Sequence, residues 1–125
     1  MAVAFLRARS KYGAERVTVD GQRFDSKGEA ARYHELVYFV KAGEVRDLRR
    51  QVSYTLHAGD RSRLVAIGRY VADFVYLQRV LNPRRDEWVS IVEDFKGVDT
   101  PLSAWKRKHL EAEYGVIVKV THATR

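Results

Sequence analysis

Cysteine is missing from this chain of 125 residues. Its absence excludes disulfides, thiolate metal sites and cysteine nucleophiles, and it fits a reducing cytoplasm, where we expect the protein to reside. The chain also lacks any apolar run near the roughly 18 to 20 residues that a membrane helix needs, so we expect no membrane association. No repeat, low-complexity tract or linker divides it, and its length is typical of one domain.

Negative charge is in short supply. The chain has 23 Lys and Arg against 16 Asp and Glu, a formal net charge of +7 at pH 7. A surplus of this size favours a polyanionic partner, and nucleic acid is the first candidate. The alternative is a basic surface with no partner. A hydrophobic content of 46% is sufficient for a packed core and argues against disorder.

Turn and capping residues divide the chain into elements. Residues 1–15 carry several basic residues with little periodicity, and we predict a flexible basic N-terminal arm. Asp20-Gly21 between alternating segments predicts a tight β-hairpin. Ser26, followed three residues later by Glu29, has the spacing of a capping box and predicts a helix that runs to about Lys41.

The second half of the chain reads mainly as strands. Thr100 and the proline after it predict the start of another helix, which runs to Tyr114. The other segments are an extended stretch at 45–56, a polar loop at 58–63, strands at about 65–77 and 88–95, a turn at 82–86 and a last strand at 116–121. The predicted order is β-hairpin, α, β, β, β, α, β, an α+β arrangement. Apolar residues on both faces of the central strands predict a sheet covered on each side.

Two of the predicted strands carry a carboxylate among apolar neighbours. Asp73 lies in the run 70–76, and Asp94 lies in the run 92–97. A buried carboxylate is costly unless it is paired or bound to a metal. A hairpin between the runs would bring the two together, and carboxylates about 5 Å apart repel by roughly 3 kcal/mol at an effective dielectric of about 20. The pattern therefore predicts a divalent metal; for Asp73 the alternative is a salt bridge to one of the many arginines.

Lys96 follows Asp94 by two residues, so both side chains project from one face of a strand. Glu93 projects from the opposite face, and we expect it either to support the site from a second layer or to face a helix. Lys96 can orient an attacking water and offset charge on a phosphate, or it can simply pair with Asp94 in an interaction worth about 0 to 1 kcal/mol. Oxygen ligands that leave room for water suit Mg²⁺, and the implied chemistry is phosphodiester hydrolysis by a metal-activated water.

Glu29 has two interpretations. It shares a helical stripe with apolar residues, so its carboxylate can lie at the sheet-facing start of the helix and complete the metal shell. Alternatively, it reaches back to cap its own helix.

Three blocks of sequence together resemble the PD-(D/E)xK nuclease superfamily, most closely a group of small phage endonucleases similar to Holliday-junction resolvases. The blocks are 24–30, 70–74 and 92–97, the last followed by Thr100, and the resemblance spans about residues 10 to 115. It implies a restriction-endonuclease-like mixed β-sheet flanked by helices, with residues 16–125 as a single nuclease-like domain. Ala72 stands where the superfamily's name has proline.

The resemblance also implies the roles of the site residues. It implies that Asp73, Asp94 and the backbone carbonyl of Phe95 hold Mg²⁺, with Mn²⁺ as a substitute, that Glu29 assists as a ligand, and that Lys96 serves the attacking water. Gln51 matches a glutamine in some branches of the superfamily. For Gln51 the choice is between a DNA or backbone contact and a strand-end cap.

Basic and polar residues of the second half are candidate phosphate contacts. Consecutive helix positions spread around the axis, so at most two of the three basic residues at 106–108 can face one partner. The predicted DNA-binding set is Thr100, Lys106, Lys108, Gln51, Arg84 and Arg85. The alternative for the helix is an ordinary solvated face. The histidines show no ligand spacing, and we assign them no chemistry.

The leading hypothesis is a Mg²⁺-dependent endodeoxyribonuclease that is selective for DNA structure. By analogy with resolvases, we expect a homodimer that acts on branched or junction DNA. One alternative is a non-catalytic DNA-binding protein that retains the nuclease fold. Another is a structural phage or mobile-element protein that binds nucleic acid through charge alone.

Overall fold

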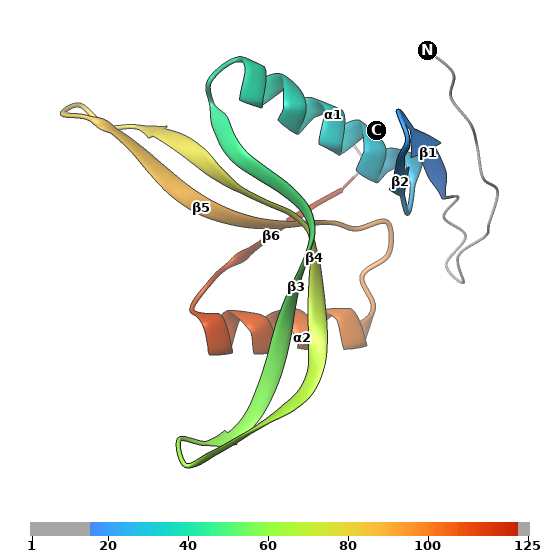
Figure 1. Ribbon diagram of the computed structural model, residues 1–125, viewed down its shortest axis with the longest axis vertical. Coiled ribbons are helices and arrows are strands. Elements are labelled where there is room, and N and C mark those ends of the chain that lie inside the picture. The colour runs from blue at the N-terminus through green and yellow to red at the C-terminus, as the bar shows by residue number, and fades with distance from the viewer. Residues whose placement is uncertain (1–15, 123–125) are drawn as a thin grey trace.

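The structure is a computed structural model that describes residues 16–122. The predicted basic arm at 1–15 lies outside the described residues. The elements, in chain order, are β1 (Val17–Val19), β2 (Gln22–Phe24), α1 (Lys27–Lys41), β3 (Val45–Asp60), β4 (Arg63–Leu81), β5 (Asp86–Phe95), α2 (Pro101–Tyr114) and β6 (Val118–Thr121) (Figure 1). This order confirms the predicted succession of elements and the α+β class. No helix in the described part is both long and apolar enough to cross a membrane.

The main sheet is mixed. Its strand order is β3-β4-β5-β6, with antiparallel pairs except for the parallel pair β5–β6, and β1 and β2 form a separate hairpin. In that hairpin Asp20 and Gly21 have φ of 53° and 77°, the left-handed values that the predicted tight turn requires. The mixed sheet and the N-terminal hairpin agree with the expected arrangement.

Helices cover both faces of the main sheet. Leu36 of α1 packs against a cluster that contains Phe74 and Tyr76. Leu110 of α2 packs against a second cluster, which contains Val75. Because neighbouring residues of β4 point to opposite faces, α1 and α2 lie on opposite sides of the sheet, as predicted.

Both helices begin at the predicted caps. The Ser26 hydroxyl accepts a hydrogen bond from the Glu29 backbone N–H at 3.1 Å, and the Thr100 hydroxyl accepts one from Ser103 N–H at 3.1 Å. The first turn of α1 lies directly on the end of β5. A Cβ at Gly28 would lie 2.4 Å from Cζ of Phe95, so glycine permits this close approach. The approach brings Glu29 close to the place where the central strands β4 and β5 stop pairing.

The predicted polar loop at 58–63 is wrong. β3 continues to Asp60 and β4 begins at Arg63, so a turn of two residues replaces the loop. The hairpin between these strands protrudes past α2 (Figure 1). Strands that project into solvent need no apolar face. The polar composition of residues 58–63, which suggested a loop, therefore reflects the exposure of this part of the hairpin.

Candidate active site

The candidate site lies where β4 and β5 separate. Their ladder ends at the pair of Phe74 and Glu93; beyond it β4 pairs with β3 and β5 pairs with β6. Asp73 and Asp94 occupy the next register position. The Asp94 Oδ1 accepts a hydrogen bond from Asp73 N–H at 3.0 Å, and the Asp73 Oδ2 accepts one from Phe95 N–H at 2.9 Å. The two aspartates therefore converge, and each satisfies a backbone donor that the ladder no longer pairs.

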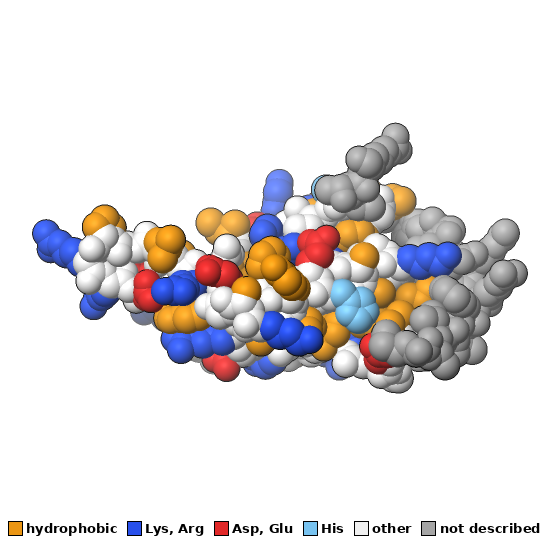
Figure 2. All heavy atoms as spheres, turned by 90° about the horizontal axis from the view of Figure 1, so that it is seen from above, with side chains coloured by type: hydrophobic (Ala, Val, Ile, Leu, Met, Phe, Trp, Pro, Cys, Tyr) orange, Lys and Arg blue, Asp and Glu red, His pale blue; other side chains and the backbone are white. Residues whose placement is uncertain are grey.

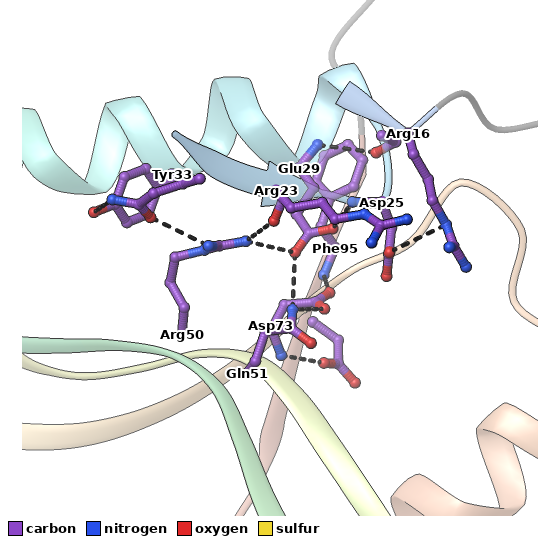
Figure 3. Close-up of polar contacts among 12 residues, drawn as sticks. Arg16, Arg23, Asp25, Glu29, Tyr33, Arg50, Gln51, Asp73 and Phe95 are labelled. Atoms are coloured by element: carbon purple, nitrogen blue, oxygen red, sulfur yellow. Dashed lines mark hydrogen bonds and ion pairs between the residues drawn. The ribbon is translucent and has the colours of Figure 1, made fainter. Parts of the chain in front are cut away.

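Glu29 reaches back to its own helix start and also faces the sheet, while its role as a metal ligand stays a prediction. It is 3% exposed, and its Oε2 accepts a hydrogen bond from Asp25 N–H at 3.1 Å, so it holds the segment just before the helix cap. Its Oε1 accepts a hydrogen bond from Nε2 of Gln51 at 3.1 Å. The same nitrogen donates to Asp73 Oδ1 at 3.3 Å (Figure 3). One carboxylate oxygen thus caps the helix, and the other belongs to the acidic cluster.

Gln51 lies inside this cluster, which neither of its predicted roles anticipates. Its backbone has φ of 52°, an unusual value for a residue with a side chain. It lies between the register pairs of Arg50 with Phe74 and of Val52 with Ala72, directly across from Asp73. Such a conformation costs of order 1 to 3 kcal/mol and is typical of functional positions. Here it accompanies an amide that links two carboxylates.

Burial and mutual repulsion disfavour the charged forms of these acids. Burial, followed by the charge of Asp73, raises the pKa of Glu29 to about 7. Burial also raises the pKa of Asp73 and of Asp94, although backbone hydrogen bonds and Lys96 oppose the rise in both. Asp94 is 1% exposed, and its Oδ2 has no hydrogen-bond partner among the described residues. Burial therefore disfavours the charged forms of all three acids, even with Arg50 and Lys96 nearby.

Lys96 borders two neighbouring hollows in the surface. Its Nζ lies 3.8 Å from Asp94 Oδ2, which agrees with the predicted placement of both side chains on one face. One hollow of about 340 Å³ is lined by Glu29, Asp73, Phe95 and Lys96, among others. The second, also of about 340 Å³, is lined by Asp94, Lys96 and Lys106. A phosphate in either hollow would meet both carboxylate and ammonium groups.

The predicted DNA contacts divide into a group on or next to α2 and the arginine pair in the turn between β4 and β5. Lys106 belongs to the second hollow, where its Nζ donates to the Arg69 carbonyl at 3.3 Å. The hydroxyl of Thr100 already caps α2. Lys108 is an exposed residue of α2 that lines neither hollow.

The arginine pair Arg84 and Arg85 lies at the other end of β5. Asp94 lies nine positions after Arg85 along β5, a span of about 30 Å. Figure 2 shows Lys and Arg side chains at the tapering end of the molecule, which is the β4–β5 hairpin of Figure 1. The structure therefore does not bring this pair to the acidic cluster, and its contact with DNA stays a prediction.

Arg50 is a site residue that the sequence analysis missed. Its guanidinium lies 3.9 Å from the centre of the Phe24 ring and 3.9 Å from Oε1 of Glu29, and it donates to the Arg23 carbonyl at 2.7 Å. These contacts tie the β1–β2 hairpin to the acidic cluster (Figure 3). Gln51 could be found because it matches a glutamine in some branches of the nuclease superfamily. Nothing in the sequence distinguished Arg50 from the other arginines of β3.

Glu93 faces α1, one of the two placements predicted for it. It is fully buried and accepts hydrogen bonds from Nε of Arg32 at 2.7 Å, from a second Arg32 nitrogen at 2.9 Å, and from the Tyr76 hydroxyl at 2.6 Å. The Thr121 hydroxyl adds a fourth hydrogen bond at 3.2 Å. Glu93 thus joins α1 to three strands and fixes the helix that carries Glu29.

The donor set fits Mg²⁺ in its chemistry. Within residues 16–122 no group of three or more His, Cys, Asp or Glu is already arranged to hold a metal ion. The available donors are nevertheless all oxygens, which Mg²⁺ prefers, and Asp94 Oδ2 accepts no hydrogen bond from any described residue. The burial of Glu29, Asp73 and Asp94, which disfavours their charged forms without a counter-ion, points the same way.

Residues 9–125 match the family described as Protein of unknown function (DUF1064). The chain belongs to this family. Comparison with curated proteins and with solved structures found no match. The description of the DUF1064 family assigns no activity, so the function rests on the geometry of the site.

The raised pKa of Glu29 predicts how stability depends on pH without added metal. A carboxyl whose pKa is higher in the folded state stabilises fully below its unfolded pKa, and this contribution is lost as the pH rises through the folded pKa. We therefore expect the free energy of unfolding to fall between about pH 4.5 and 7. Urea denaturation at several pH values with EDTA measures this fall.

Glu29→Gln is the variant that isolates the effect, because it keeps the side-chain shape without the charge. Its stability relative to the natural protein should increase between pH 5 and pH 7. An unchanged difference over this interval would contradict the electrostatic account of the cluster.

Proposed function

We propose that the protein is a metal-dependent endodeoxyribonuclease that hydrolyses DNA phosphodiesters. The observation that carries the proposal is the convergence of Asp73, Asp94 and Lys96 where β4 and β5 separate, beside Glu29 on α1. Buried carboxylates next to a lysine and two open hollows support metal-assisted phosphate chemistry. The net charge of +7 supports a nucleic-acid substrate.

The residues have distinct roles in this proposal. Asp73, Asp94 and the Phe95 carbonyl would hold Mg²⁺, or Mn²⁺ in its place, with Glu29 as a further ligand. When bound, the ion supplies a Lewis acid and lowers the pKa of a water molecule. Gln51 holds Glu29 and Asp73 in position through its amide.

The two lysines act on the substrate. Lys96 orients the water and offsets charge on the phosphate as it develops in the transition state. Lys106, at the edge of the second hollow, binds a neighbouring phosphate.

The substrate we propose is branched DNA, cut by a homodimer in the cytoplasm. The test is incubation with a four-way junction and a matching linear duplex, in Mg²⁺ and in EDTA. We expect nicking of the junction in Mg²⁺ and none in EDTA. Cleavage of the linear duplex alone would contradict the proposed selectivity for junctions. If the protein sediments as a monomer and still cuts the junction, the proposed homodimer is wrong.

A second candidate function is non-catalytic DNA binding on the same fold. The observation that favours it is that both aspartates accept backbone hydrogen bonds across the gap between strands, a structural role that needs no metal. Tight binding of the junction with no cleavage in Mg²⁺ or Mn²⁺ would support this candidate and overturn the enzyme.

A further inference from the structure

The outer part of the β3–β4 hairpin has no partner within the described chain. Residues 58–69, here called the β-arm, are all exposed and protrude past α2 (Figure 1). Leu64, Val65 and Ile67 are 64%, 49% and 56% exposed. An isolated ribbon of two strands is only marginally stable in water, so other contacts must hold the β-arm in shape.

The root of the β-arm is fixed to α2. Oε1 of Glu113 accepts a hydrogen bond from the His57 backbone N–H. Oε2 of Glu113 lies 2.7 Å from Nδ1 of the His57 ring. Nε2 of His109 lies 2.8 Å from the His57 carbonyl. The Tyr114 hydroxyl donates to the Thr55 carbonyl. Three residues of the helix therefore set the direction in which the β-arm projects.

The tip of the β-arm is also ordered by specific contacts. Oδ1 of Asp60 accepts hydrogen bonds from Ser62 N–H at 2.9 Å, from the Ser62 hydroxyl and from Arg63 N–H at 3.1 Å. Gly59 has φ of 117°, and a Cβ there would overlap the Arg63 carbonyl. The ribbon is thus preorganised, which lowers the entropic cost of binding a partner.

The charge of the β-arm selects the kind of partner. Arg61 and Arg63 lie at its tip and Arg69 at its root, and within residues 16–122 none of the three makes an ion pair within 4 Å. Asp60, its one acid, is occupied by the turn. A second copy of this chain, with its net charge of +7, would meet the β-arm with like charge. A polyanion is the complementary partner.

The reach of the β-arm matches duplex DNA. Asp73 lies ten positions after Arg63 along β4, a span of about 33 Å, and one turn of B-DNA is about 34 Å. Lys106 and Arg69 lie in contact between these ends. The major groove of DNA admits a ribbon of two β-strands.

We propose that the β-arm lies in a groove of duplex DNA about one helical turn from the phosphodiester at the acidic cluster. This inference rests on the proposed function, because it takes a duplex arm of the branched DNA proposed for that site as the partner. It names Arg61 and Arg63 as phosphate contacts, and it assigns the exposed apolar residues to the groove.

The test compares R61A/R63A with the matched variant K41A/R46A, which removes the same charge from the end of α1 and the start of β3. Binding to a duplex of about 30 bp, roughly three turns, is measured by fluorescence anisotropy in EDTA at several salt concentrations. For R61A/R63A we expect the slope of log K against log salt to decrease in magnitude by about 1.8, since each lost phosphate contact contributes about 0.9. K41A/R46A should keep the slope of the natural protein.

Two outcomes of the salt titration overturn the inference. An unchanged slope in R61A/R63A shows that the β-arm does not contact DNA. An unchanged slope with a loss of dimer in sedimentation shows that it binds a second copy of the chain. Because binding is measured in EDTA, absence of cleavage in Mg²⁺ overturns the enzyme alone, whereas absence of any DNA binding overturns both proposals. Circular dichroism of each variant checks that it is folded.

Discussion

Asp94→Asn should lower the rate of Mg²⁺-dependent cleavage by about 10³-fold, which corresponds to about 4 kcal/mol of transition-state stabilisation. Asparagine keeps an oxygen to accept the hydrogen bond from Asp73 N–H, so the join between β4 and β5 should survive. What it removes is the charge on Oδ2, which accepts no hydrogen bond from residues 16–122 and lies 3.8 Å from Lys96 Nζ. Single-turnover cleavage of the junction measures the loss.

The matched control for this variant is Asp47→Asn. Asp47 is an exposed acid of β3 with φ of 55°, a conformation that asparagine tolerates well. It should cleave like the natural protein, and both variants should bind DNA in EDTA. Cleavage by D94N at the natural rate would show that Asp94 is structural.

Glu93→Ala should destabilise the fold by about 3 to 5 kcal/mol, the usual cost of removing one partner of a buried ion pair. The change leaves the guanidinium of Arg32 without its two-point partner and removes the acceptor of the Tyr76 hydroxyl. Domains of this size are stable by about 5 to 15 kcal/mol, so a large part of the total would be lost. Urea denaturation measures the change.

Glu35→Ala is the control for Glu93, because Glu35 pairs with the same arginine at 2.9 Å but has a side chain that is 60% exposed. Its loss should cost no more than about 1 kcal/mol. Equal effects of the two variants would mean that the buried network does not hold α1 on the sheet.

Much of the fold follows from local signals. Asp20-Gly21, the caps at Ser26 and Thr100 and the stop at Gly115 each act within a few residues, and the helices begin and end where these predict. The β3–β4 hairpin was underestimated because its end is polar on both faces, and polar alternation without burial resembles a loop.

The candidate site could be predicted only in part. Asp73 and Asp94 converge because both lie one residue beyond the end of the β4–β5 ladder, and a hairpin fixes that register. The position of Gln51 depends on a left-handed backbone that no residue type announces. Arg84 and Arg85 lie in the predicted turn, at the end of β5 opposite to the cluster, and their contact with DNA stays a prediction.

The central claim is that the cluster of Glu29, Asp73 and Asp94 binds a divalent cation. Titration of Mn²⁺ followed by electron paramagnetic resonance measures it directly, because the signal of free Mn²⁺ is lost on binding. We expect the natural protein to remove the signal with saturable binding that Mg²⁺ reverses, and the double variant D73N/D94N to leave it unchanged. Equal binding by both proteins, or none by either, would contradict the account.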